Sequence, residues 1–205
     1  MAVHQSYERY WDSRFKRQAV KILPGDYFVT NGKEMIVTVL GSCISACVHD
    51  ELLKVGGMNH FMLPQNKSYK NNNHHIDVID DSKAARYGNV AMERLVNDII
   101  KLGGSRHNMK AKIFGGGRIT NARTDIGLDN IDFVREYLDI ENIEILSEDV
   151  GDIYPRKVYY IPESNEVYVK KIERMNNDTI MVRENNYIKS LKKTETESQV
   201  FFLSD

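Results

Sequence analysis

Cysteine is scarce in this sequence, and its scarcity excludes several kinds of site. Cys43 and Cys47 are the only two cysteines among the 205 residues. Their Cys-x-x-x-Cys spacing matches neither the Cys-x-x-Cys of a redox pair nor half of a four-ligand zinc site. Long apolar runs are also missing: no stretch approaches the roughly 20 residues that span a bilayer, and the N-terminus lacks the apolar core of a signal peptide. We therefore expect a cytoplasmic protein, in which the two cysteines do not form a structural disulfide.

An excess of charge of either sign is absent too. Lys and Arg total 28 and Asp and Glu total 29, which leaves a net charge of −1. We therefore expect no general attraction to nucleic acid or to anionic membranes. The triple glycine at 115–117 lacks both the spacing of a dinucleotide-binding loop and the lysine of a phosphate-binding loop, so we interpret it as a tight turn near the site. His74 and His75 stand in an Asn-rich stretch where we expect no dedicated metal site, and we expect neither a metal nor an organic cofactor.

The composition is that of a folded globular domain. Hydrophobic residues make up 41% and charged residues 28% of the chain, and a chain of this length normally forms one domain with a sizeable core. Aromatic residues at helical spacing, Tyr7, Trp11 and Phe15, predict a short amphipathic helix between residues 7 and 20. The Asn31-Gly32 step between two β-rich stretches predicts a hairpin. We expect strands at 26–30, 34–40, 43–49 and 54–64.

The second half of the chain alternates strands and helices. A polar loop is expected at 65–82, followed by a long helix at 83–102 with Ser82 as its N-cap. We then expect a strand at 110–115, a helix near 130–138 and strands at 143–149, 157–162 and 166–172. Many strands with two packed helices predict an α+β fold, a layered sandwich of mostly antiparallel strands. We divide the chain into an N-terminal helical extension at 1–20, one domain at 21–175 and a partly mobile C-terminal extension at 176–205.

Cys43 stands where Gly41 and Ser42 interrupt an apolar run. If residues 43–49 form a strand, Cys43 and Cys47 share the face opposite its apolar side chains. A turn just before the strand lets the Cys43 thiol and its backbone N–H face a cleft together, as a nucleophile beside an oxyanion hole requires. Cys47 lies roughly 13 Å further along such a strand, too far for a disulfide. The alternative is a structural cysteine, because free cysteines are among the most buried residue types.

His60 is the candidate partner of this thiol. A cysteine nucleophile acts as a thiolate and benefits from a neighbouring imidazole that takes its proton. His60 lies in the next apolar stretch, and a turn centred near Leu52 sets it opposite about residue 44 if the two strands pair antiparallel. Of the other histidines, His49 is a lesser candidate at a strand end. The alternative for His60 is a core histidine satisfied by a backbone carbonyl.

Two motifs together resemble a known family. VLGSCISACVHD at 39–50 and VGGMNHFMLP at 55–64 closely resemble the paired signature of the chemoreceptor glutamine deamidases, the CheD family, and the spacing of seventeen residues from Cys43 to His60 fits as well. The resemblance continues through RYGNVAMERLVNDIIKLGG at 86–104, AKIFGGG at 111–117 and NIEILSEDVGD at 142–152. It covers roughly residues 21–172.

The resemblance implies a fold and a site, and the chain departs from the family pattern at one position. The fold would be a layered α/β sandwich similar to the bacterial toxin deamidases, with Cys43 as nucleophile and His60 as general base. The third catalytic member of the family aligns six residues before the cysteine, where this chain has Val37, with Thr38 one step later. Neighbouring strand residues point to opposite faces, so Thr38 would substitute only if a bulge near Gly41 shifts the register. Ser42 or a backbone carbonyl is the alternative group to orient the imidazole.

The activity that the resemblance implies is hydrolysis of glutamine side chains through a cysteine thioester, with ammonia released. The substrates would be methyl-accepting chemotaxis receptors, the glutamates formed would serve adaptation, and glutamyl methyl esters would follow the same route. Backbone amides near Gly41, Ser42 and Cys43 are candidate oxyanion donors. Two alternatives stay open: a cysteine hydrolase of another kind, such as a peptidase, and a binding module that regulates a chemotaxis phosphatase with catalysis secondary or lost.

Overall fold

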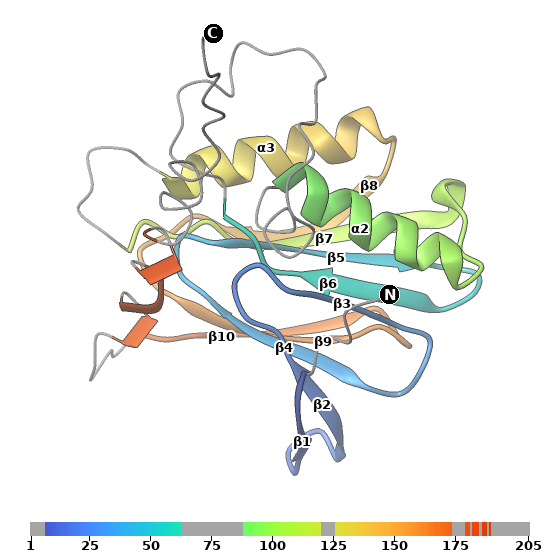
Figure 1. The fold of residues 1–205 in the computed structure, drawn as a ribbon, viewed down its shortest axis with the longest axis horizontal. Helices are drawn as coiled ribbons and strands as arrows, with labels where there is room; N and C mark the ends of the chain where they lie inside the picture. The colour runs from blue at the N-terminus through green and yellow to red at the C-terminus, as the bar shows by residue number, and fades with distance from the viewer. Residues whose placement is uncertain are drawn as a thin grey trace, which may run out of the picture.

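Two facing β-sheets and a layer of helices make up the described part of the chain. The computed structural model describes residues 7–62, 88–119 and 126–173, and in the C-terminal segment 179, 180, 182–184, 186, 187 and 189. Helices α2 (Gly88–Lys101) and α3 (Ile126–Ile140) cover the outer face of one sheet, and the second sheet lies on its other side (Figure 1). The expected α+β class and the layered sandwich are confirmed.

Each sheet has five strands, and most neighbours are antiparallel. The first sheet has the order β1 (Glu8–Asp12), β2 (Arg17–Lys21), β4 (Met35–Leu40), β9 (Arg156–Ile161) and β10 (Glu166–Lys171). The second sheet has the order β3 (Tyr27–Thr30), β6 (Val55–Asn59), β5 (Ile44–Asp50), β7 (Met109–Gly115) and β8 (Glu144–Val150). Only the pairs β2/β4 and β7/β8 are parallel in these sheets. A short 3₁₀ turn, η2 (Arg106–Asn108), leads into β7.

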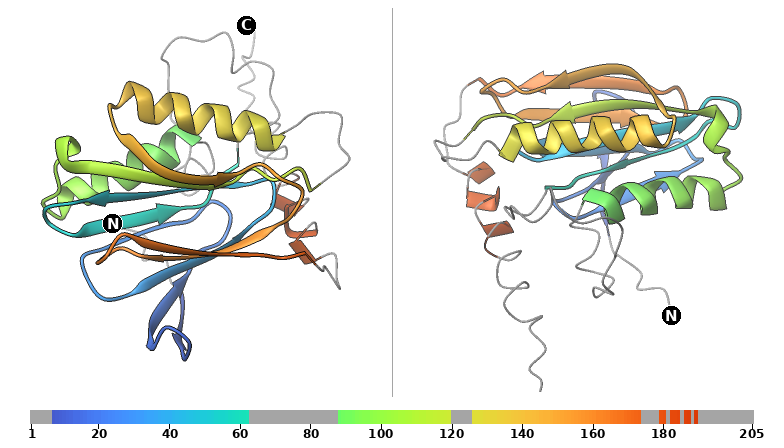
Figure 2. Two further views of the ribbon diagram at one scale, coloured as in Figure 1. Left: turned by 180° about the vertical axis from the view of Figure 1, so that it is seen from behind. Right: turned by 90° about the horizontal axis from the view of Figure 1, so that it is seen from above.

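The prediction of an N-terminal helix from aromatic spacing is wrong, because residues 8–21 form an antiparallel strand pair. The Asp12 carboxylate accepts hydrogen bonds from the Arg14 and Phe15 amides at 3.0 and 3.3 Å and stabilises the turn between the strands. The Phe15 ring then packs 5.1 Å from the ring of Tyr159 on the first sheet. Strand β2 pairs with the edge of β4 and so extends the first sheet, which shows that tertiary pairing overrides the local spacing. The hairpin projects from the sandwich (Figure 2).

The hairpin expected at Asn31-Gly32 is wrong as well. Strand β3 pairs with β6 in the second sheet, while β4 pairs with β2 and β9 in the first. Gly32 also lacks the positive φ that a two-residue hairpin turn requires. The step is therefore a turn, as its residues predict, but it carries the chain from one sheet to the other. Packing between the sheets, rather than the turn itself, decides whether the two strands on either side of a turn pair with each other.

Most of the remaining elements fall close to their predicted positions, but β6 ends at Asn59, well before the predicted strand end at 64. Strands β5, β7, β8, β9 and β10 match the predicted ranges within about two residues, and α3 is longer than predicted at both ends. The described part of the long helix starts at Gly88. The polar stretch at 65–82, with Ser82, His74 and His75, lies outside the described residues. Within the described ranges, no helix has the length and apolar character needed to cross a membrane.

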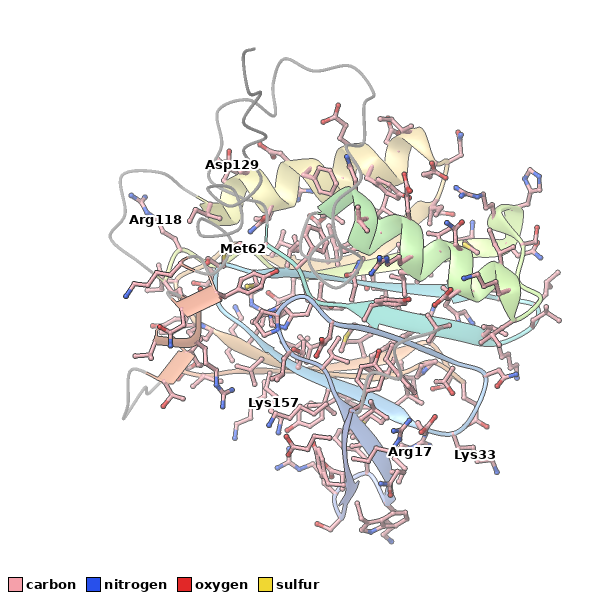
Figure 3. All side chains as sticks on the ribbon, in the orientation of Figure 1. Arg17, Lys33, Met62, Arg118, Asp129 and Lys157 are labelled. Carbon is pink, nitrogen blue, oxygen red and sulfur yellow. The ribbon has the colours of Figure 1, made fainter. Side chains whose placement is uncertain are left out.

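Strand β5 lies at the centre of the second sheet and is buried on both faces. Its Ile44, Ala46 and Val48 side chains pack under the helices, in the core that also holds Leu95 and Val134. The opposite face, with Cys43 just before the strand and Cys47 within it, belongs to a second core between the two sheets. Side chains of both sheets fill this space (Figure 3). The predicted division of β5 into two faces is confirmed, but the cysteine face is buried rather than open to a cleft.

Candidate active site

The candidate nucleophile lies at the point where the chain crosses between the sheets. Strand β4 ends at Leu40 in the first sheet, and β5 begins at Ile44 in the second. Residues 41–43 make this crossing, and their backbone N–H groups are not used in either strand ladder. The sequence signal for the crossing is the small Gly-Ser pair, which interrupts the apolar run and permits a sharp change of direction.

Backbone hydrogen bonds from the triple glycine fix the chain at this crossing. The Gly116 N–H donates to the Cys43 carbonyl at 2.7 Å, and the Gly117 N–H donates to the Gly41 carbonyl at 2.8 Å. Gly115 has a φ of +113°, and a Cβ there would collide with the Cys43 carbonyl oxygen. The fully buried Asn130 side chain of α3 adds a bond from its Nδ2 to the Ser42 carbonyl, at 2.9 Å. The tight turn expected at 115–117 therefore approaches the site with its backbone, as predicted.

His60 lies on the same face as Cys43. Ile44 and Phe61 exchange both backbone hydrogen bonds, at 2.9 and 3.0 Å, so His60 stands opposite Ser45, one residue further on than expected. This register makes Cys43 and His60 diagonal neighbours. Diagonal neighbours on one face of an antiparallel pair lie about 7–8 Å apart, within reach of long side chains. Both side chains are buried, with exposed fractions of 0% and 2%.

Thr38 holds the imidazole in one tautomer. Its hydroxyl donates to the Ile22 carbonyl at 2.9 Å and lies 2.7 Å from Nδ1 of His60. A threonine hydroxyl carries a single hydrogen, so its oxygen accepts from His60 and Nδ1 carries the ring proton. His60 Nε2 is then an acceptor, and among the described residues it has no hydrogen-bond partner. The structure thus leaves one imidazole nitrogen free to accept a proton.

The departure at Val37 has a simple structural explanation. Val37 packs on the outer face of the first sheet beside Tyr159, so alternation along β4 turns Thr38 inward, toward His60. The expected mismatch between Thr38 and Cys43 does not arise, because the crossing at 41–43 ends the alternation before Cys43 is reached. The alternative group, Ser42, donates its hydroxyl to Glu184 at 2.7 Å rather than to the imidazole.

Burial dominates the electrostatics of the pair. Desolvation raises the pKa of the Cys43 thiol well above its ordinary value, and the negative charge and hydrogen bond of Glu184 raise it further. Desolvation also lowers the pKa of His60 to about 3. Both groups are therefore neutral at neutral pH in this arrangement. Burial likewise raises the pKa of Cys47, which belongs to the same core.

The neutral, buried imidazole predicts a loss of stability in acid. Below pH 6.5, His60 of the unfolded chain binds a proton that native His60 does not bind until about pH 3, so acid favours unfolding. Because of this one group, the free energy of unfolding should fall by about 1.4 kcal/mol when the pH is lowered from 7.5 to 5.5. Urea unfolding at both pH values, for the unaltered chain and His60→Gln, measures the difference. An equal loss in both proteins contradicts a buried neutral His60.

Glu184 is the site residue that sequence reasoning missed. Its carboxylate accepts hydrogen bonds from the amides of Gly41 at 3.0 Å, Ser42 at 3.1 Å and Cys43 at 3.4 Å. Glu184 belongs to the helical residues of the C-terminal segment, which the sequence analysis assigns to a partly mobile extension. A signal was present: Ile180, Glu184 and Tyr187 recur at helical spacing, which places an acidic residue on an otherwise apolar face.

A pocket of about 300 Å³ opens beside the pair. Its lining includes Thr38, His60 and Glu184, together with the side chains of Lys21 and Lys157. Cys43 does not line it, in the part of the chain that the structure describes. A thiol, an imidazole and a hydroxyl gathered at a turn lined by backbone amides is the arrangement used by enzymes that form acyl-cysteine intermediates.

Comparison with known proteins places the chain in a family. The family model described as CheD chemotactic sensory transduction matches residues 62–171. A relative from Hahella chejuensis is 46% identical over 96% of this chain and 90% of its own length, and one from Methylobacillus flagellatus is 48% identical over 93% and 92%. A third, from Herminiimonas arsenicoxydans, is 44% identical over 98% and 97%. All three carry the name probable chemoreceptor glutamine deamidase CheD. The chain belongs to the CheD family.

Proposed function

We propose that this chain is a cysteine-dependent protein-glutamine deamidase that acts on methyl-accepting chemotaxis receptors. The names of its relatives support the reaction and the substrate class. The observation that carries the proposal is the row of backbone amides at residues 41–43 that binds the Glu184 carboxylate next to the Cys43 thiol, with His60 lining the same pocket as Glu184. A carboxylate in this place has the shape of a glutamine side chain and the chemistry of the product.

The reaction begins when His60 Nε2 takes the proton of the Cys43 thiol. The thiolate attacks the carbon of a glutamine carboxamide, and the carbonyl oxygen becomes an oxyanion that the amides of residues 41–43 stabilise. His60 returns the proton to the carboxamide nitrogen, and the C–N bond breaks. Ammonia is released and a thioester remains on Cys43. Water activated by His60 then hydrolyses the thioester to glutamate and restores the thiol. Glutamyl methyl esters would form the same thioester with loss of methanol.

The role proposed for Thr38 is to hold His60 with Nε2 facing the thiol. The glutamates that the enzyme forms on receptors would then be methylated and demethylated during adaptation. This sequence of steps assigns no task to Cys47, which lies behind Cys43 in the core between the sheets.

The test of this function uses a cytoplasmic receptor fragment and intact-mass spectrometry. We expect a gain of about 1 Da at each modified site, since an amide becomes an acid, with free ammonia and no cleavage of the backbone. The assay includes Glu184→Ala beside the unaltered chain, because Glu184 occupies the candidate oxyanion donors. Cleaved peptide would point to a peptidase instead. No gain with either protein would contradict the deamidase and favour a regulatory binding module for a chemotaxis phosphatase.

Thr38→Val is expected to lower turnover about 10- to 100-fold, the range for residues that orient a functional histidine. Valine keeps the shape of threonine but removes the hydroxyl that accepts from Nδ1 at 2.7 Å, so the imidazole loses its fixed tautomer. The pH–rate profile should shift, and Thr38→Ser should restore most of the activity. A purely structural Thr38 would lower stability without moving the pH profile.

A further inference from the structure

The C-terminal segment inserts one acidic side chain into the candidate site. Glu184 is only 3% exposed, and its two carboxylate oxygens accept from three consecutive backbone amides and from the Ser42 hydroxyl, at 2.7 to 3.4 Å. The same carboxylate also accepts a hydrogen bond from the Cys43 thiol. A single residue, 141 positions further along the chain, thus occupies every donor that an oxyanion would use.

The chemistry of this occupant matches the proposed reaction. A glutamate side chain has the same length as glutamine and is what deamidation of glutamine produces. Its carboxylate takes a hydrogen bond from the Cys43 thiol, so the side chain reaches the group that would attack a carboxamide. A carboxylate is not attacked in the same way, because its negative charge repels a thiolate and its oxygens compete for the donors.

We propose that Glu184 is an internal product analogue that fills the glutamine subsite and holds the enzyme in a closed, inactive state. The proposal rests on the proposed deamidase function. It follows that a receptor glutamine enters only when the helical residues around Glu184 have moved away from the crossing at 41–43. The C-terminal segment is therefore an autoinhibitory element of this chain.

The contacts around Glu184 fit an element that can be released. Ile180 lines the pocket, and Tyr187 packs in the core beside Cys43 and Met62. The other described residues of the segment are exposed, such as Val182 and Asn186. Among the described residues the carboxylate takes its hydrogen bonds from neutral groups, while cationic side chains, including that of Arg183, line the pocket beside it. Only two described side chains of the segment, Glu184 and Tyr187, are buried, and an element with few buried contacts can open locally.

The first test measures the reactivity of the Cys43 thiol and does not depend on catalysis. Release of Glu184 should raise this reactivity both by opening access to the thiol and by removing the charge and hydrogen bond that raise its pKa. Iodoacetamide should alkylate Cys43 of Glu184→Ala at least about tenfold faster than Cys43 of the unaltered chain, the factor expected if the open state is one tenth or less of the population. Glu173→Ala is the matched control, because Glu173 is an exposed glutamate that precedes the segment. Cys47 reports on unfolding, since it is buried and does not touch Glu184. Equal Cys43 rates in all three proteins would overturn the proposal.

The second test turns the internal analogue into a substrate. In Glu184→Gln the new carboxamide lies at the thiol, so Cys43 should attack its carbon, release ammonia and form an internal thioester that water hydrolyses to glutamate. The purified protein should gain about 1 Da over time, as an amine is replaced by a hydroxyl, and take up one heavy oxygen from labelled water. Glu184→Gln combined with Cys43→Ala should keep its mass.

The two tests separate failure of this inference from failure of the deamidase function. Receptor deamidation without faster alkylation of Glu184→Ala and without self-deamidation of Glu184→Gln would leave the enzyme activity and overturn the product analogue. Faster alkylation of Glu184→Ala with no deamidation of receptor or of Glu184→Gln would support occupancy of the site and contradict the deamidase. Receptor turnover that rises in Glu184→Ala but not in Glu173→Ala supports both.

Discussion

Cys43→Ala is expected to abolish deamidation of receptor glutamines, with a loss of about 10⁴-fold or more, as removal of a covalent nucleophile produces. The proposed route passes through a thioester, and no other described side chain at the crossing can form one. Alanine keeps the packing of a small buried residue, so the free energy of unfolding should fall by only about 1 kcal/mol. The measurement is the rate of mass gain of a receptor fragment, in the unaltered background and in Glu184→Ala.

Cys47→Ala is the matched control for this loss. Both cysteines are fully buried in the core between the sheets, so their replacement has a similar cost in packing. Of the two cysteines, only Cys43 lies at the crossing, where its backbone N–H donates to the Glu184 carboxylate. We expect Cys47→Ala to retain most of the activity. Comparable activity in the Cys43→Ala protein would exclude the thioester mechanism, whatever the stability of either variant.

His60→Ala should reduce turnover by about 10²- to 10⁴-fold, the usual contribution of a general acid and base. Without the imidazole, the Cys43 thiol loses its proposed general base, and desolvation keeps its pKa well above the ordinary value. Thr38 cannot take over, because a neutral hydroxyl is far too weak a base to accept the thiol proton near neutral pH. The rate of ammonia release at several pH values measures the effect.

Added imidazole distinguishes a base from a core histidine. The space left by the His60 ring lies beside the pocket of about 300 Å³, so imidazole in solution should restore part of the activity of His60→Ala. A core histidine without a catalytic role would give the opposite result: a less stable protein that keeps its turnover when assayed below its unfolding temperature. That result would also remove the reason for the Thr38 prediction.

Much of the fold follows from local patterns in the sequence. The apolar stretches that become β5, β7 and β9 are β-rich and bounded by turn residues, and such patterns depend only on neighbours along the chain. Partners of a strand depend on residues far away, which is why the chain does turn at Asn31-Gly32 but the hairpin predicted there is absent. The aromatic spacing of Tyr7, Trp11 and Phe15 fits a helix equally well until the edge of β4 offers backbone partners to residues 19–21.

The sequence by itself determined the candidate pair and the family. Cys43 is one of two cysteines, a Gly-Ser pair precedes it, and a single turn separates its strand from that of His60, so all of this information is local. Only the tertiary structure decided between Val37 and Thr38, because the face that turns inward depends on where the first sheet packs against the second. It also decided the place of Glu184, whose contacts with residues 41–43 span more than 140 positions. Hydrogen bonds between such distant segments exist only once the sheets have packed, and no local pattern encodes them.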